Sequence, residues 1–168
     1  MSPSRFLLGA VTVVTAVLLQ SSVVSRLPLP GTAPDLVLVL VVAFALVEGP
    51  LSGLVTGFVA GLLADLPADH QLGRLALAYA LVGYTCGLVQ DDTERSTLLP
   101  FTVVALGALG SLLVFSAEGV LLGDPRVVWA AVARAVVSSV PYDVVLTPFV
   151  VPAVGALVRR VDPDPVRR

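Results

Sequence analysis

Charged residues are scarce in this chain of 168 residues, and their scarcity excludes most soluble folds. They make up 13 % of the sequence, whereas soluble domains carry about 25 %. Lysine is absent, and the formal net charge of −2 gives no basic field of the kind that binds nucleic acid. Hydrophobic residues form 57 % of the chain and the mean hydropathy is +0.97. We therefore expect the lipid bilayer to be its solvent and membrane lipid to be one of its partners.

Cysteine and histidine are each present only once. As the only cysteine, Cys86 cannot form an intrachain disulfide. Because it lies in an apolar run, we expect it to pack as a small apolar side chain. His70 lies in a predicted loop, where a single histidine is usually solvated. We expect no metal and no cofactor, because the pattern contains no Cys/His cluster. No catalytic arrangement of Ser, His and Asp is recognisable either, which favours a protein that is not an enzyme.

Long apolar runs, separated by proline, glycine and charged residues, predict an all-α integral membrane protein with about six transmembrane helices. We interpret the first run as a retained helix rather than a signal peptide, because further apolar runs follow it. The first five helices are expected at residues 6–24, 36–47, 51–66, 74–89 and 98–122. The second and third of these are short for a full span.

The last apolar stretch is too long for one span, and Pro141 lies in its middle. Because proline ends or kinks most helices, we expect an interfacial or re-entrant segment at 127–139 and a final span at 140–158. Residues 1–160 are then a single polytopic membrane domain, and 161–168 form a short polar cytoplasmic tail.

The arginines predict the orientation of the six spans. With both termini in the cytoplasm, six arginines lie inside and three lie outside, which follows the positive-inside rule. The inner set is Arg5, Arg95, Arg159, Arg160, Arg167 and Arg168, and the outer set is Arg26, Arg74 and Arg126.

Three glycines follow one face of the third predicted helix. Gly53, Gly57 and Gly61 are four residues apart, and because four residues advance by about 400° they form one ridge. Such a ridge lets another helix approach to backbone contact. We expect it to serve either helix packing within the chain or docking of a partner's membrane helix.

Several ionisable or polar residues are expected at one depth in the outer half of the membrane. Asp35 begins the second helix, Asp65 ends the third and Arg74 opens the fourth. Asp143 lies 16 residues before Arg159, about 24 Å above the inner boundary at ~1.5 Å per residue. Because such residues are costly in a membrane and usually have partners, we predict an outer polar layer. Its members are Asp35, Asp65, Arg74 and Asp143, with Tyr142 or Arg134 as a further candidate.

The order of these motifs resembles that of the MreD family. The relevant segments are 33–40, with Pro34-Asp35-Leu36, then 48–53, then the Gly57 to Asp65 stretch, then 72–84, and finally 141–148. In the last segment Asp143 stands where the family carries Asn.

The resemblance implies a non-enzymatic membrane scaffold of the bacterial cell-elongation machinery, which builds lateral peptidoglycan. It implies as partners MreC, the actin-like cytoskeletal protein, and the glycosyltransferase and transpeptidase of the lateral wall. It also implies location in the bacterial cytoplasmic (inner) membrane. The expected fold is similar to that of the substrate-binding subunits of energy-coupling-factor transporters.

Two other interpretations remain. A vitamin carrier subunit of an energy-coupling-factor transporter would use the outer polar layer as its ligand pocket, although one Trp and three Tyr are few for such a site. A membrane-embedded enzyme acting on lipid would need a catalytic pair, for which Asp65 and Asp143 are the candidates.

Overall fold

The computed structural model describes residues 3–67, 71–93, 96–125 and 127–161, and these residues are helical without a β-strand. The elements are α1 (Pro3–Ser22), η1 (Val24–Arg26), α2 (Leu36–Glu48), α3 (Pro50–Asp65), α4 (Arg74–Gly87), α5 (Gln90–Thr93), α6 (Leu99–Leu121) and α7 (Trp129–Val161). The prediction of an all-α protein with several apolar helices is confirmed. His70 and 162–168, most of the predicted tail, lie outside the described residues.

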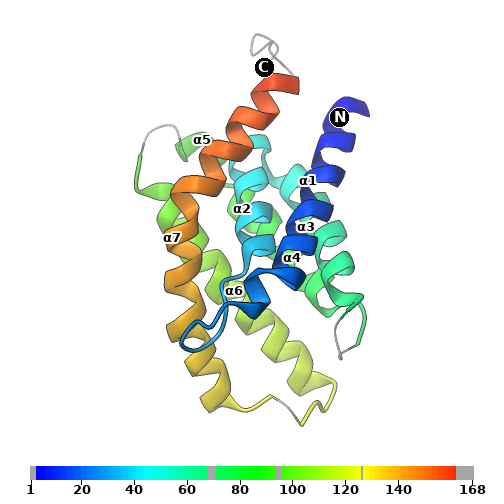
Figure 1. The fold of residues 1–168 in the computed structure, drawn as a ribbon, viewed down its shortest axis with the longest axis vertical. Helices are drawn as coiled ribbons and strands as arrows, with labels where there is room; N and C mark the ends of the chain where they lie inside the picture. Colours follow the sequence, from blue (N-terminus) through cyan, green and yellow to red (C-terminus); the bar gives the residue numbers. More distant parts are fainter. Residues whose placement is uncertain (1–2, 68–70, 94–95, 126, 162–168) are drawn as a thin grey trace.

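The bundle is built around α2, which contacts α1, α3, α4, α6 and α7 (Figure 1). Ten of its thirteen residues are buried, from Val37 to Leu46 without interruption. A helix that is apolar on every side is expected at such a position, because it has no face that must meet water. The position of α2 places its start, with the half-buried residues Asp35 and Leu36, against the neighbouring helices.

Helices α3 and α4 pack together at backbone contact. A Cβ atom on Gly53, Gly57 or Gly61 would overlap main-chain atoms of α4. On the other side, Gly83 and Gly87 of α4 lie just as close to main-chain atoms of Gly53 and Pro50. The glycine ridge of α3 is therefore covered by α4 within this chain.

Helix α7 differs from the sequence prediction. It runs for 33 residues from Trp129 to Val161 with Pro141, Pro148 and Pro152 inside it, so the predicted break at Pro141 and the separate segment at 127–139 are wrong. The three prolines are exposed and share one side of the helix, so their rings do not disturb the packed side. Long apolar helices tolerate proline when neighbouring groups satisfy the freed carbonyls, and this removes the reason for a break.

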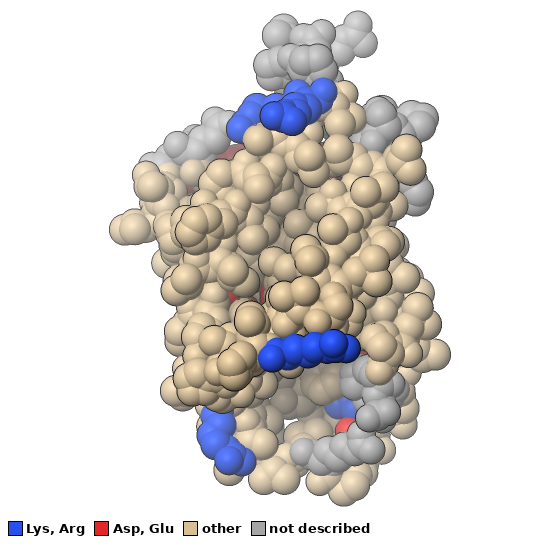
Figure 2. All heavy atoms as spheres, in the orientation of Figure 1, with Lys and Arg blue, Asp and Glu red and all other residues tan. Residues whose placement is uncertain are grey.

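Among the described residues, three helices are long and apolar enough to cross a membrane, namely Leu7–Arg26, Leu99–Leu121 and Trp129–Val161. Helices α2 and α3 are shorter apolar helices. Figure 1 shows the start of α1 and the end of α7 at the same end of the bundle, together with α5. On the face drawn in Figure 2, a broad band without basic side chains separates those at the top from those in the lower part of the molecule, as expected for a protein that crosses a membrane.

Candidate functional site

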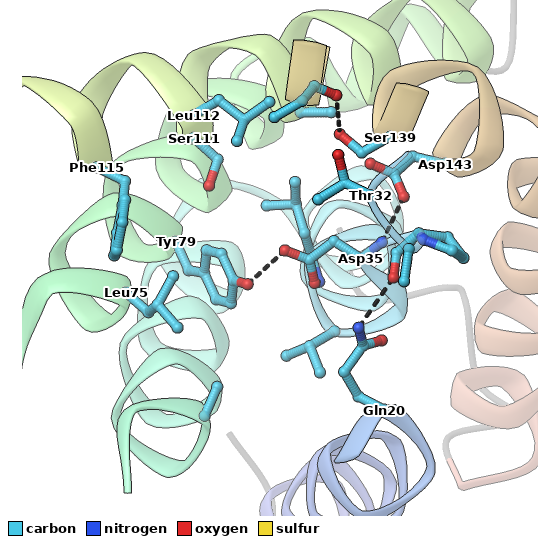
Figure 3. Close-up of a pocket in the computed structure, with 17 residues that line it drawn as sticks. Gln20, Thr32, Asp35, Leu75, Tyr79, Ser111, Leu112, Phe115, Ser139 and Asp143 are labelled. Atoms are coloured by element: carbon cyan, nitrogen blue, oxygen red, sulfur yellow. Dashed lines mark hydrogen bonds between the residues drawn. The ribbon is translucent and has the colours of Figure 1, made fainter. Parts of the chain in front are cut away.

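Two groups of polar residues lie inside the bundle, toward the end opposite the start of α1 and the end of α7. The first, called here the Asp35 cluster, consists of Gln20, Asp35, Tyr79 and Asp143 (Figure 3). The second, called the Arg74 cluster, consists of Arg74, of Phe115 and Asp124, which contact its guanidinium group, and of Asp65, which caps the same helix start. Residues of α1, α3, α4, α6 and α7, together with the N-cap of α2, contribute to the two clusters, so the clusters tie the bundle together.

Asp35 is the N-cap of α2 and the centre of the first cluster. Its Oδ1 accepts a hydrogen bond from the backbone N–H of Leu38 at 3.0 Å, which satisfies one of the free donors at the helix start. Its Oδ2 accepts a hydrogen bond from the Tyr79 hydroxyl of α4 at 2.5 Å. Because α2 is buried, this side chain fixes the helix start against a neighbouring helix.

Gln20 holds the chain on both sides of Asp35. Its Nε2 donates to the carbonyl of Pro34 at 2.9 Å, and its Oε1 accepts from the N–H of Leu36 at 3.0 Å. A single amide of α1 therefore satisfies a donor and an acceptor at the entrance to α2. Gln20 was not among the predicted site residues, although a lone amide near the end of an apolar run is a signal that could have indicated it.

Asp143 reaches the same point from α7. Its side chain is 1 % exposed, and its Oδ1 accepts a hydrogen bond from the backbone N–H of Asp35 at 2.6 Å. The Asp143 carbonyl also accepts from the hydroxyl of Thr147, one turn later. Two carboxylates, from residues 108 positions apart, thus meet at one helix start.

Asp65 closes the start of α4 from the end of α3. Its side chain is 0 % exposed and accepts hydrogen bonds from the N–H groups of Gly73 at 2.7 Å, Leu75 at 3.2 Å and Ala76 at 3.4 Å. Gly73 has φ 101°, a left-handed conformation that favours glycine and turns the chain into α4. The carboxylate and the positive end of the α4 dipole attract each other.

Arg74 is buried rather than interfacial, with 5 % of its surface exposed. Its Nη1 pairs with Asp124 Oδ2 at 2.8 Å, and its Nη2 donates to the carbonyl of Phe115 at 3.0 Å. The guanidinium carbon also lies 4.1 Å from the centroid of the Phe115 ring, a cation–π contact. Asp124, which follows α6, was not among the predicted site residues.

Tyr142 and Arg134, the two further candidates for the layer, have other contacts. The Tyr142 hydroxyl donates to the carbonyl of Pro30 at 3.4 Å, in the loop before α2. Arg134 is exposed, and its Nε donates to the carbonyl of Ala130 in its own helix.

A cavity of about 330 Å³ lies beside the Asp35 cluster (Figure 3). Residues of α1, the loop before α2, and α2, α3, α4, α6 and α7 line it. Its polar lining residues are Gln20, Thr32, Asp35, Tyr79, Ser111, Ser139 and Asp143. Phe115 is shared between the cavity wall and the Arg74 cluster, so the two clusters are neighbours.

The described residues contain no group of three or more His, Cys, Asp or Glu that could hold a metal ion. Cys86 is buried, with its Sγ 3.9 Å from the carbonyl of Val103. Each carboxylate of the two clusters is engaged by backbone N–H groups, a hydroxyl or an arginine of the chain itself. The geometry is that of groups that hold helices in place.

A comparison with protein families decides what kind of protein this is. The family model of rod shape-determining protein MreD matches residues 2–160 of the 168. The chain belongs to the MreD family. It is a rod shape-determining membrane protein, and its family is a structural one that is not known for enzymatic activity. No curated protein and no solved structure matched the chain, so the expected likeness to energy-coupling-factor subunits stays a prediction.

The segments that carry the resemblance to the MreD family fall at the two clusters. The Pro34-Asp35-Leu36 segment is the start of α2, and the stretch that ends at Asp65 is the glycine ridge followed by the α4 cap. The segment that contains Tyr142 and Asp143 lies in α7, where it meets Asp35. Residues that are far apart in the MreD pattern therefore contact one another in the folded chain.

Proposed function

We propose that this chain is a non-enzymatic scaffold of the bacterial cell-elongation complex, which builds lateral peptidoglycan, and that it binds MreC. The MreD family match over nearly the whole helical bundle is the observation that carries the proposal. The polar clusters are consistent with it, because their hydrogen bonds hold helix starts. A scaffold needs such a fixed shape more than it needs a reactive group.

We also propose that the protein lies in the cytoplasmic membrane with the start of α1 and the end of α7 on the cytoplasmic side. Arg159 and Arg160 in the last turn of α7 support this orientation, because arginines are retained on the inner side of the membrane. In this orientation both polar clusters lie in the outer half of the bundle.

Depletion of the protein in its own rod-shaped bacterium tests the proposed role. We expect the rods to widen and become round, and a fluorescent D-amino acid to label the lateral wall less. Re-expression of the wild-type chain should restore both properties. Rods of normal width and normal lateral labelling after depletion would contradict the role.

Cross-linking in native membranes, followed by purification of a tagged chain and mass spectrometry, tests the partner. MreC should be enriched relative to a purification with an equally tagged, unrelated membrane protein of similar size. If depletion rounds the cells but MreC is not enriched, the scaffold has another partner and the MreC part of the proposal is wrong.

A further inference from the structure

The cavity beside the Asp35 cluster has one acidic side and one apolar side. Asp35 and Asp143 lie on the first, and Leu75, Leu112 and Phe115 lie on the second (Figure 3). Its volume of about 330 Å³ is at the lower end of the range of ~300–1,000 Å³ for ligand sites. A space of this size and mixed character fits a small amphiphilic molecule.

Ser111 provides the first indication of a ligand. It is 5 % exposed, lines the cavity, and within the described part of the chain its hydroxyl has no hydrogen-bond partner. Other buried hydroxyls of these helices, those of Ser116 and Ser139, donate to the carbonyl four residues earlier. The Ser111 hydroxyl instead points into the cavity, toward the space in front of Tyr79 and Asp35 (Figure 3). Because this hydroxyl faces the cavity without a partner among the described residues, it can bond a polar group that is bound there.

Asp143 provides the second indication. Its Oδ1 accepts from the N–H of Asp35, but across the described residues its Oδ2 has no hydrogen bond, although the side chain is 1 % exposed. No lysine or arginine is among the described residues that line the cavity. Two carboxylates without a cation in the same cavity favour a positively charged guest.

The donor set selects among cations. Ca²⁺ takes six to eight oxygen ligands, and Mg²⁺ keeps several waters in a strict octahedron. Both carboxylates here are already partly engaged by the chain. An ammonium group needs only a few acceptors, and the wall of Leu75, Leu112 and Phe115 can hold an attached apolar part.

We propose that this cavity binds a small organic ammonium ion, with its charged end at Asp143 and its apolar part against Leu112 and Phe115. Asp143 Oδ2 then accepts an N–H group of the ligand. Ammonium binding in this cavity is independent of MreC binding, so an experiment that contradicts one of them leaves the other standing.

Two probe pairs of matched shape test the site on the full chain in detergent or in lipid nanodiscs. Phenethylammonium is compared with phenethyl alcohol, and n-butylammonium with n-butanol, by thermal unfolding and by isothermal titration calorimetry. Each ammonium should bind saturably and raise the unfolding temperature, and each alcohol should bind about ten-fold more weakly or worse. Equal effects of an ammonium and its alcohol, or no effect of either, would overturn the proposal.

Variants at Asp143 and Ser111 locate the binding. Asp143→Asn should weaken ammonium binding about ten-fold, because the charge of the acceptor is lost while its amide oxygen can still accept from the N–H of Asp35. Ser111→Leu should abolish binding by filling the cavity, and Ser116→Ala should leave binding unchanged, because Ser116 bonds within its own helix. Unchanged binding in both Asp143→Asn and Ser111→Leu would show that the ammonium binds elsewhere.

Discussion

At the scale of single residues, Asp35 and Asp65 do the same task at two different helices. Each carboxylate accepts backbone N–H groups at a helix start, Asp35 at its own helix α2 and Asp65 at the neighbouring helix α4. Inside a membrane protein no water replaces such an acceptor, so the free donors of a buried helix start must be satisfied by the chain. The two acids therefore fix where two helices begin.

Replacement of Asp65 by alanine should destabilise the protein by about 1–3 kcal/mol, because the N–H groups of Gly73, Leu75 and Ala76 lose their buried acceptor. Unfolding of the purified variant in mixed micelles by increasing amounts of a denaturing detergent measures the change. Asp91→Ala is the control, because Asp91 is exposed in the short helix α5. Equal stability of the two variants would mean that the hydrogen bonds of Asp65 do not contribute to the stability of the protein.

From the sequence we predicted a common depth for these residues, but not their individual contacts. Depth follows from helix boundaries, and Asp35, Asp65 and Arg74 each lie at one. The hydrogen-bond partners of these residues depend on how the other helices are arranged around α2, and this arrangement cannot be inferred from residue spacing. Gln20, Tyr79 and Asp124 therefore went unpredicted, although each bonds directly to a residue that the sequence had singled out or to its neighbours.

At the scale of helices, small residues decide how closely α3 and α4 approach. The ridge of Gly53, Gly57 and Gly61 faces main-chain atoms of α4. Gly83 of α4 in turn lies against the main chain of Gly53. Packing of this kind is driven by van der Waals contact, because lipid offers no hydrophobic gain between helices. The same contact places Tyr79 and Arg74 of α4 beside their partners.

Gly57→Leu should separate α3 from α4 and destabilise the protein by about 3 kcal/mol or more, because even a Cβ at this position overlaps the carbonyl of Tyr79. We expect a lower level of folded protein in the membrane and a lower unfolding temperature after purification. Gly9→Leu in α1 is the matched control, since a Cβ there meets nothing within 4 Å. A Gly57→Leu protein with the stability of the Gly9→Leu protein would refute the close packing.

Helix ends were predicted well where proline, glycine or charge follows an apolar run. The predicted range 36–47 differs from the observed Leu36–Glu48 by one residue at one end, and 98–122 differs from Leu99–Leu121 by one residue at each end. Pro141 misled the prediction because the usual cost of proline applies to a helix in water. In α7 the ring lies on the exposed side, and the sequence alone does not reveal which side that is.

At the scale of the whole molecule, the six long helices alternate in direction, so the start of α1, α5 and the end of α7 share one end (Figure 1). The loop before α2 lies at the other end with both polar clusters. The proposed orientation therefore places α5 in the cytoplasm and the loop before α2 outside.

Single cysteines introduced into a Cys86→Ala background test this orientation. In spheroplasts, a maleimide that cannot cross membranes should label Pro28→Cys, which is exposed in the loop before α2. Asp91→Cys in α5 should react only after the membrane is permeabilised. The reverse pattern would show that the protein is inserted the other way, and labelling of both without permeabilisation would contradict the alternating arrangement.

The complete enclosure of α2 has a consequence for synthesis of the protein. Ten of its thirteen residues are buried, and five of the helices that contact it follow it in the chain. When α2 leaves the ribosome, α3, α4, α6 and α7 do not yet exist, so α2 must first be accepted by the insertion machinery and by lipid. An evenly apolar surface suits α2 both when lipid surrounds it and when the later helices cover it. Polar side chains within α2 could form hydrogen bonds in the finished protein, but they would make membrane insertion less favourable. The demands of biogenesis thus explain why Asp35, which precedes α2, and not a residue within it, anchors the centre of the molecule.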